Sequence, residues 1–339
     1  MQIGVIVPKP ASGEKGGAER LYQGLVDGLN ALGAVAKLVE VPTDEATYET
    51  IEESYLRCYD LDVSGFDAVI STKAPTYAVR HERHICYLLH TMRTFYDMFD
   101  SVFPQPSAEM ELRRKKVIDL DTAALRSPRT RRVFAIGHEV AARLARYNAI
   151  TAEVLHPPST LACQPGVQGD YLLLPGRLHR WKRVDLAIDA VRRARCNVTL
   201  KICGVGEDEQ IFREVAGTDR KIEFCGYVTD AELIKLYSNC LAVVFVPVRE
   251  DFGYVALEAI SSAKPLITCT DSGEPARLIE DGHTGFIAEP NSSSLSDTID
   301  KVAGDPALAI RVGLQAKQQA PHLSWSRIAR LLLTGLDAA

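Results

Sequence analysis

Short apolar runs alternate with amphipathic or polar stretches along almost the whole chain. The runs have the length and composition of buried strands, and stretches such as residues 21–32 carry leucines at helical spacing. Strand-like runs occupy residues 3–8, 35–41, 68–71, 85–89, 133–136, 154–155, 171–174, 198–203, 222–225, 241–246, 266–268 and 286–288. Because strands alternate with helices, the pattern predicts an α/β fold with parallel sheets covered by helices on both faces.

A segment rich in proline and glycine, residues 156–170, interrupts this alternation near the middle of the chain. We therefore expect two domains, residues 1–160 and 161–323, and a chain of 339 residues is long enough to give each its own core. Residues 324–339 have the apolar spacing of an amphipathic helix, which we expect to pack back on the first domain.

Composition excludes several classes of function. The net charge of −5 argues against a nucleic-acid partner. No apolar run approaches the length of a membrane span, and Met1 leads directly into the first strand-like run, so we expect a cytoplasmic protein. The eight cysteines have no paired spacing, which predicts reduced, hydrophobic side chains and neither a disulfide framework nor a metal site.

Eight basic residues lie between Arg113 and Arg132, against two aspartates. This local excess leaves two interpretations open. It is either a solvated face or a surface that touches anionic lipid headgroups or a phosphorylated acceptor, and the lipid contact would place the protein peripherally on the inner face of the membrane.

Residues 246–259 form the most informative stretch. The strand-like run ends at Pro247, a loop spans residues 249–253, and a helix is expected over residues 254–263. The first amides of such a helix point beyond the strand end and favour an anion, which predicts a phosphate site. Glu250 and Glu258 flank the loop, and their carboxylates suit sugar or ribose hydroxyls, although solvated charges would show the same spacing.

Two cations follow the first strand-like run of the second domain. Arg177 and Lys182 stand where that strand ends and a helix begins near Val184. Cations are unfavourable at a helix N-terminus unless an anion is bound there, so this pattern favours neutralisation of a diphosphate over ordinary surface charge.

Further strand ends carry glycine or polar residues. Gly16 and Gly17 lie in a loop before the first helix, which is either an anion site or a plain turn, and no dinucleotide or phosphate-loop motif is present. His90 follows the run 85–89, where it could donate to a sugar hydroxyl or be satisfied structurally. The turns 204–206 and 226–228 follow two strands of the second domain, where backbone can lie against a nucleobase.

Four motifs occur in a fixed order and together point to one family. They are Gly16-Gly17-Ala18-Glu19-Arg20, Gly176-Arg177-Leu178 with Lys182, the glutamate pair Glu250 and Glu258, and Asp281-Gly282-His283-Thr284-Gly285-Phe286. In this order the chain resembles, nearly end to end, the retaining, nucleotide-sugar-dependent glycosyltransferases of the glycosyltransferase-four type. The resemblance implies the GT-B fold, in which two Rossmann-like domains face each other across a cleft. Residues 87–93 are similar to the His-Thr-Pro-x-Arg segment of bacterial polysaccharide and lipid-linked oligosaccharide mannosyltransferases.

The resemblance also implies roles for individual residues. The second domain would bind the nucleotide sugar and the first domain the acceptor. In the second domain Arg177 and Lys182 would bind the donor diphosphate, Glu258 the ribose and Glu250 the donor sugar, with His90 of the first domain beside that sugar. The remaining donor contacts would come from Gly16, Gly17, Gly204, Tyr227, Val228, Phe252, Gly253, Tyr254 and Val255.

The sequence therefore predicts a retaining hexosyltransferase that moves a sugar from GDP-mannose or a UDP-hexose to a glycan, lipid-linked or small-molecule acceptor. No metal or other cofactor is expected, because Arg177 and Lys182 supply the positive charge that the leaving diphosphate needs. Two alternatives use the same fold. One is a sugar-nucleotide epimerase or a phosphorylase, and the other is a protein that binds a nucleotide sugar without turning it over.

Overall fold

A computed structural model describes residues 1–10 and 17–337 of the chain. The chain divides into two units: unit 1 comprises Met1–Thr160 and Leu323–Ala339, and unit 2 comprises Leu161–His322. The division between Thr160 and Leu161 falls within the segment rich in proline and glycine. Within the described ranges each unit contains one six-stranded sheet, and the paired strands in both sheets are parallel.

The sheet of unit 1 has the strand order β2-β1-β3-β4-β5-β6. Its strands are β1 (Gln2–Pro10), β2 (Val35–Thr43), β3 (Ala68–Ser71), β4 (His84–Leu88), β5 (Thr130–Ala135) and β6 (Glu153–Val154). The helices of this unit are α1 (Gly17–Asn30), α2 (Tyr48–Tyr59), α3 (Phe99–Val102), α4 (Ala108–Leu125), α5 (His138–Asn148) and α13 (Trp325–Asp337), with short 3₁₀ turns η1 (Thr76–Ala78) and η2 (Arg93–Phe95). Strands β3 and β4 are buried along their whole length, as central strands of a sheet covered on both faces must be.

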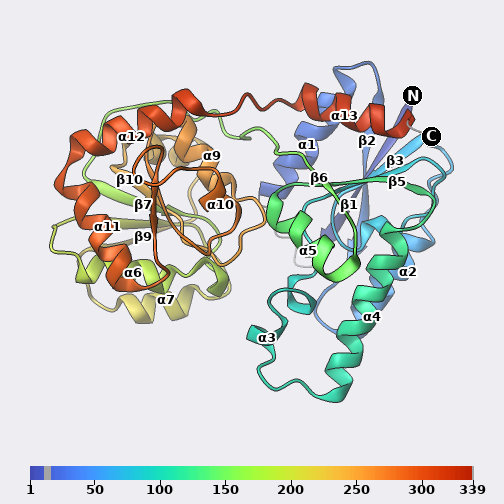
Figure 1. The fold of residues 1–339 in the computed structure, drawn as a ribbon, viewed down its shortest axis with the longest axis horizontal. Coiled ribbons are helices and arrows are strands. Elements are labelled where there is room, and N and C mark those ends of the chain that lie inside the picture. Colours follow the sequence, from blue (N-terminus) through green and yellow to red (C-terminus); the bar gives the residue numbers. More distant parts are fainter. Residues whose placement is uncertain (11–16, 338–339) are drawn as a thin grey trace. The chain divides into compact units, whose positions relative to one another are not determined.

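Helix α13 lies beside α1, although more than 290 residues separate their sequences (Figure 1). The contact depends on two glycines of α1. A Cβ atom at Gly24 would overlap the indole ring of Trp325, and a Cβ at Gly28 would crowd the Trp325 backbone. These positions therefore let the two helices approach closely.

The sheet of unit 2 has the order β12-β11-β10-β7-β8-β9. Its strands are β7 (Tyr171–Pro175), β8 (Thr199–Cys203), β9 (Ile222–Gly226), β10 (Ala242–Val244), β11 (Leu266–Cys269) and β12 (Phe286–Ala288). Its helices are α6 (Val184–Arg193), α7 (Glu209–Ala216), α8 (Asp230–Asn239), α9 (Tyr254–Ser261), α10 (Glu274–Arg277), α11 (Ser292–Gly304) and α12 (Pro306–Gln319), with the 3₁₀ turn η3 (Arg180–Lys182). Two apolar clusters, one on each face of this sheet, form its core.

The α/β class and the parallel sheets predicted from the sequence are confirmed. Strand β10 is shorter than the apolar run 241–246 that predicted it. The run continues in extended form, since Phe245 N still donates to Ile267 O at 2.9 Å, but Pro247 has no amide to donate and the chain turns away there. All eight cysteines are free thiols, as expected, and no described helix is both long and apolar enough to cross a lipid bilayer.

Candidate functional site

The loop between β10 and α9 is held by backbone hydrogen bonds to two neighbouring segments of unit 2. Val248 N donates to Trp181 O at 2.8 Å, Arg249 N to Asp271 O at 2.9 Å and Glu250 N to Ser272 O at 2.9 Å. Gly253 precedes α9 with φ +76°, and a Cβ there would crowd the Phe245 ring and the Glu250 side chain. The loop therefore presents the start of α9 at the carboxyl edge of the sheet, and Gly253 provides no side-chain cap for it.

Lys182 and Glu250, two residues singled out in the sequence, meet at this edge. Lys182 Nζ lies 2.6 Å from Glu250 Oε2, with 24% and 18% of the two side chains exposed. The ammonium group also lies over the Phe245 ring, 5.2 Å from its centroid. A short pair of this kind has a well-defined position but stays accessible to an incoming charged ligand.

Arg177 is also at the carboxyl edge, but it does not stand alone there. Its guanidinium makes two hydrogen bonds to the Glu207 carboxylate, at 2.9 and 3.1 Å, and about half of its side chain is exposed. His179 Nε2 lies 3.5 Å from the same carboxylate, and burial lowers the pKa of this histidine. Glu207 had no expected role from the sequence, although an acid directly after the turn 204–206 was a signal for one.

Arg183 is a second residue for which the sequence predicted no role. It contacts both oxygens of Asp271 at 2.7 and 2.9 Å, and it donates to Val246 O at 2.6 Å and Pro247 O at 2.9 Å. A fork that binds a carboxylate and two carbonyls in this way fixes the end of β10 against the loop after β11. These contacts of Arg183 stabilise the position of the loop that carries Glu250.

Glu258 occupies a different environment from the one expected. The helix spacing predicted oxygens that reach over the mouth of the loop, yet Glu258 is buried in α9 and its Oε2 accepts a hydrogen bond of 2.6 Å from the Tyr237 hydroxyl. Burial and the adjacent Glu258 charge hold the pKa of Tyr237 well above its ordinary value, so the hydroxyl keeps its proton and donates. One oxygen of the Glu258 carboxylate is therefore hydrogen-bonded to a residue of α8.

The glycine turns after β7, β8 and β9 lie together. Gly204 N donates to Gly226 O at 2.8 Å and Gly176 N to Cys203 O at 2.9 Å. Gly204 has φ +135°, and a Cβ there would overlap the carbonyl oxygen of Gly176, so glycine is required. Beyond this flat backbone Tyr227 is 78% exposed and Val228 is half-buried, an arrangement that can receive a planar ring.

In unit 1, His90 follows β4 and is partly buried. Its Nδ1 lies 2.7 Å from Thr91 O, so Nδ1 carries the proton and donates. Burial, and then the charges of Lys73, Arg143 and Arg93, hold the pKa of His90 well below its ordinary value. The neutral ring thus offers Nε2 as an acceptor, which corrects the expectation that His90 donates to a hydroxyl. Gly17 begins α1, and Gly16 lies outside the described residues.

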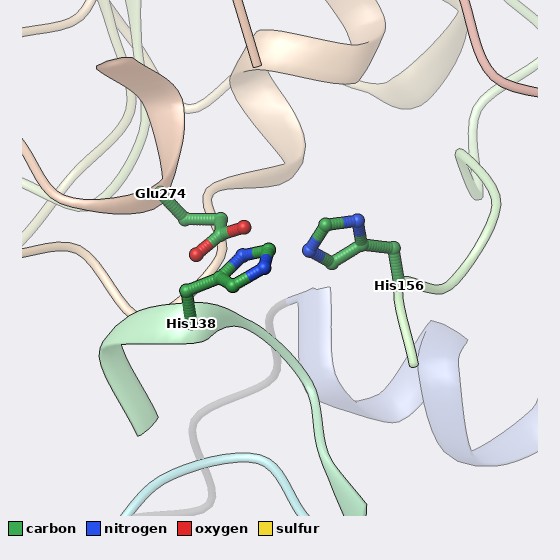
Figure 2. Close-up of side chains that lie close together, drawn as sticks. All are labelled: His138, His156 and Glu274. Carbon is green, nitrogen blue, oxygen red and sulfur yellow. The ribbon is translucent and has the colours of Figure 1, made fainter. Parts of the chain in front are cut away.

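Two further histidines of unit 1 lie against each other. The ring of His138, at the start of α5, faces the ring of His156 after β6, with centroids 5.5 Å apart and ring planes at 64° (Figure 2). An edge-to-face contact of this kind is a favourable packing arrangement of two rings.

The basic residues between Arg113 and Arg132 are mostly paired within unit 1. Arg113 contacts Glu49 and Glu109, and Lys115 contacts Asp119. Arg129 and Arg132 lie 3.3 and 3.8 Å from Glu82 and Glu153, respectively. Local neutralisation of this kind favours a solvated face over a headgroup-binding surface.

Comparison with known proteins identifies the type of domain that holds this site. Residues 166–319 match the profile of the family described as "Glycosyl transferases group 1". The human alpha-1,3/1,6-mannosyltransferase ALG2 is 30% identical over 165 residues, which are 43% of this chain and 39% of that protein. The chain spans about two fifths of the length of the curated relatives it matches.

Solved structures resemble the chain over a greater length. Sucrose-phosphate synthase from Thermosynechococcus elongatus has a TM-score of 0.77 at 17% identity, covering 98% of this chain and 97% of its own. HepE from Anabaena, in complex with UDP and glucose, has a TM-score of 0.74 at 16% identity and covers 100% of both chains. At these identities the likeness concerns the fold, which is the GT-B type that the sequence motifs implied.

Lys182, Glu250, Glu258 and the glycine turns all lie within the matched segment. Residues 166–319 therefore form a glycosyltransferase group 1 domain.

Proposed function

We propose that the chain is a retaining glycosyltransferase that moves a hexose from a nucleotide-diphosphate donor to a glycan, lipid-linked or small-molecule acceptor. The observation that carries this proposal is the Lys182–Glu250 pair, 2.6 Å apart beside the start of α9 in the glycosyltransferase group 1 domain. A cation, a carboxylate and the first amides of a helix are the groups that a diphosphate joined to a sugar requires. ALG2 is named as a mannosyltransferase and HepE was solved with UDP and glucose, so GDP-mannose and UDP-glucose are the donors to test first.

The donor would lie along the carboxyl edge of the unit 2 sheet. Its base would rest on the backbone after Gly204 and beside Tyr227 and Val228. Its ribose would be bound by the carboxylate of Glu258, and its distal phosphate or sugar by the amides of residues 252–255. Glu250 would bind the sugar hydroxyls, and the family resemblance also assigns a role at the diphosphate to Gly16 and Gly17.

The two cations would act on the leaving group. When a nucleotide diphosphate departs, negative charge grows on its terminal phosphate, and Lys182 and Arg177 would stabilise that charge. Both now contact carboxylates, so a donor phosphate would replace Glu207 at Arg177 and share Lys182 with Glu250. Exchange of one anionic partner for another costs less than desolvating a free cation.

Retention would follow front-face attack, in which the acceptor hydroxyl approaches from the side of the departing diphosphate and gives its proton to a phosphate oxygen. No protein nucleophile is needed on this route. His90 would contribute by accepting a hydrogen bond from a donor-sugar hydroxyl at Nε2, a role that suits a ring held neutral.

A donor panel tests the proposal. The purified full-length chain is incubated with GDP-mannose, UDP-glucose, UDP-galactose and UDP-N-acetylglucosamine, with and without mixed acceptors, and released nucleotide is measured. Release that rises with acceptor supports glycosyl transfer. Conversion of the donor without acceptor would indicate an epimerase. Sugar release that requires inorganic phosphate would indicate a phosphorylase. Binding of the donor without turnover would indicate a non-catalytic binding protein.

A further inference from the structure

Asp208 is the N-cap residue of α7 in unit 2, and only 3% of its side chain is exposed. An aspartate at this position usually accepts a hydrogen bond from one of the first amides of its own helix. Within α7, whose residues the structure describes, Asp208 makes no such bond. Its Oδ2 accepts instead from the Arg180 amide, at 2.6 Å, at the start of the 3₁₀ turn η3. The buried carboxylate therefore stabilises a different segment from the helix that it precedes.

Backbone hydrogen bonds join the same two segments of unit 2. Leu178 N donates to Val205 O at 3.0 Å, and Asp208 N donates to Leu178 O at 3.1 Å. Gly206 permits this close approach, because a Cβ atom there would overlap the carbonyl oxygen of Leu178. The residues that lead from β7 into η3 are thus held against residues 204–208, and the Asp208 carboxylate extends this contact to the first amide of η3.

The bond from the Arg180 amide matters more than the contact with the Arg180 side chain. The guanidinium lies 3.1 Å from Asp208 Oδ1, but 70% of the Arg180 side chain is exposed, so water screens this ion pair and it contributes little. A backbone amide that donates to a buried, ionised carboxylate makes a shorter and stronger bond. Asp208 therefore acts mainly on the backbone of η3.

Lys182 is the last residue of η3, and a different loop holds that end of the turn. Arg183 follows directly and donates to Val246 O and Pro247 O at the end of β10. The turn is therefore attached to the segment after β8 at its first residue and to the segment after β10 beyond its last. Because η3 has only three residues, these two attachments together determine where the Lys182 side chain leaves the backbone.

We propose that Asp208 is a positioning residue for glycosyl transfer, which holds η3 so that Lys182 meets the leaving phosphate of the donor. This inference rests on the proposed function and extends it to a residue that does not itself contact the donor. A misplacement of about 1 Å in a group that stabilises the transition state reduces turnover on the order of 100-fold. A helix cap is given up where function requires the side chain elsewhere, which accounts for the absence of an Asp208 bond within α7.

Steady-state kinetics of the full-length chain, with the donor that it turns over, measure this role. Asp208→Ala should lower kcat about 10- to 100-fold, with a smaller change in KM. Asp208→Asn should retain most of the turnover, because its amide oxygen can still accept from the Arg180 amide. If Asp208→Ala does not fold, Asp208→Leu fills the space of the carboxylate without an acceptor. Turnover by Asp208→Asn as slow as that of the alanine or leucine variant would overturn the proposal.

Asp300 offers a matched control in the same unit. Its side chain is 11% exposed, and its carboxylate accepts from the amides of Cys196 at 2.9 Å and Arg195 at 3.2 Å. These amides precede β8, at the amino edge of the sheet, opposite to the edge that carries Lys182. Asp300→Ala should lower the melting temperature as Asp208→Ala does but leave kcat unchanged. Equal losses of kcat in the two variants would mean general destabilisation and would overturn the positioning role.

A double-mutant cycle tests whether Asp208 acts through Lys182. In the Lys182→Ala background there is no lysine to position, so the further substitution Asp208→Ala should change kcat by less than about twofold. A loss of the same size in both backgrounds would show that Asp208 acts independently of Lys182, which contradicts the proposal.

Hydrogen exchange separates this inference from the proposed function, because it needs no substrate. The amides of residues 180–182 should exchange faster in Asp208→Ala than in wild type, and at the wild-type rate in Asp300→Ala. Unchanged exchange in Asp208→Ala overturns the inference whatever the activity. If wild type turns over no donor, the proposed function fails, and the exchange rates still decide whether Asp208 fixes the turn that carries Lys182.

Discussion

Lys182 and Glu250 are 68 residues apart in the sequence and 2.6 Å apart in space. Lys182 belongs to the turn after β7 and Glu250 to the loop after β10, two strands that pair in parallel, so both segments leave the sheet at the same edge. The pair is solvated enough that its contribution to stability is modest, on the order of 1 kcal/mol or less. We therefore expect the Lys182–Glu250 pair to contribute mainly to function.

The Lys182→Ala variant separates the contribution of the pair to function from its contribution to stability. Loss of a cation that stabilises the leaving diphosphate should reduce kcat/KM for the donor about 100- to 1,000-fold, while the melting temperature changes little. Lys201→Ala is the matched control, because Lys201 also pairs with a glutamate, at 3.4 Å, and its side chain is 27% exposed. Full activity of Lys182→Ala at saturating donor would contradict the role proposed for this lysine.

Tyr237→Phe tests the environment of Glu258. The substitution removes the hydroxyl that donates to the buried carboxylate at 2.6 Å, so the free energy of unfolding should fall by about 1.5–3 kcal/mol. Tyr171→Phe removes a hydroxyl that donates to the neutral carbonyl of Leu236 at 2.8 Å and should cost less, about 0.5–1.5 kcal/mol. Urea denaturation of the two variants measures the difference, and equal losses would mean that the Glu258 contact is worth no more than a neutral one.

Glu258 itself is tested through the ribose. If the Glu258 carboxylate binds the ribose hydroxyls, wild type should bind UDP more tightly than 2′-deoxy-UDP, and Glu258→Gln should lose most of that preference. Calorimetric titration of both nucleotides against both proteins gives the four affinities. A preference that survives intact in Glu258→Gln would assign ribose recognition to another residue.

The apolar runs predicted the strands of both sheets, and the rule for parallel strand ends predicted that Lys182 would lie at the same edge as Glu250. The pattern did not predict the burial of Glu258. Helix α9 is apolar on nearly every side, so its sequence contains no polar stripe from which the orientation of a single glutamate could be deduced. The Arg177–Glu207 and Arg183–Asp271 contacts join separate loops, and their geometry depends on the twist of the sheet, which residue spacing does not encode.

Gly24→Ala tests the contact between α1 and α13. Alanine favours a helix, but the added methyl group would overlap the indole of Trp325, so overpacking should dominate and cost about 1–3 kcal/mol. Hydrogen exchange in residues 325–337 should become faster. Gly65→Ala, at a position with open space around the added carbon, is the control and should leave that exchange unchanged.

The stability of unit 1 should depend on pH through His84, which is buried between β3 and β5. Thr130 donates its hydroxyl to Ala124 O and so accepts from His84 Nδ1, at 3.0 Å, which leaves Nε2 to accept from the Ser71 hydroxyl at 2.8 Å. Protonation of Nε2 would break this arrangement. Burial, followed by the charge of His81, lowers the pKa of His84 to about 3.

The direction of this pH dependence follows from the protonation of His84 in the folded and the unfolded state. Between about pH 3 and 6.5 the unfolded chain binds the proton and the folded chain does not, so the contribution of His84 to stability is lost as the pH falls below 6.5. Asp121 acts in the opposite direction, because burial raises its pKa to about 6 in the folded state. The free energy of unfolding of His84→Gln is subtracted from that of wild type. This subtraction cancels the contributions of Asp121 and of every other group that the two proteins share. This difference should decrease by up to about 1.4 kcal/mol per pH unit from pH 6.5 to 4.5, measured by urea denaturation. A difference independent of pH would mean that His84 is already protonated in the folded protein.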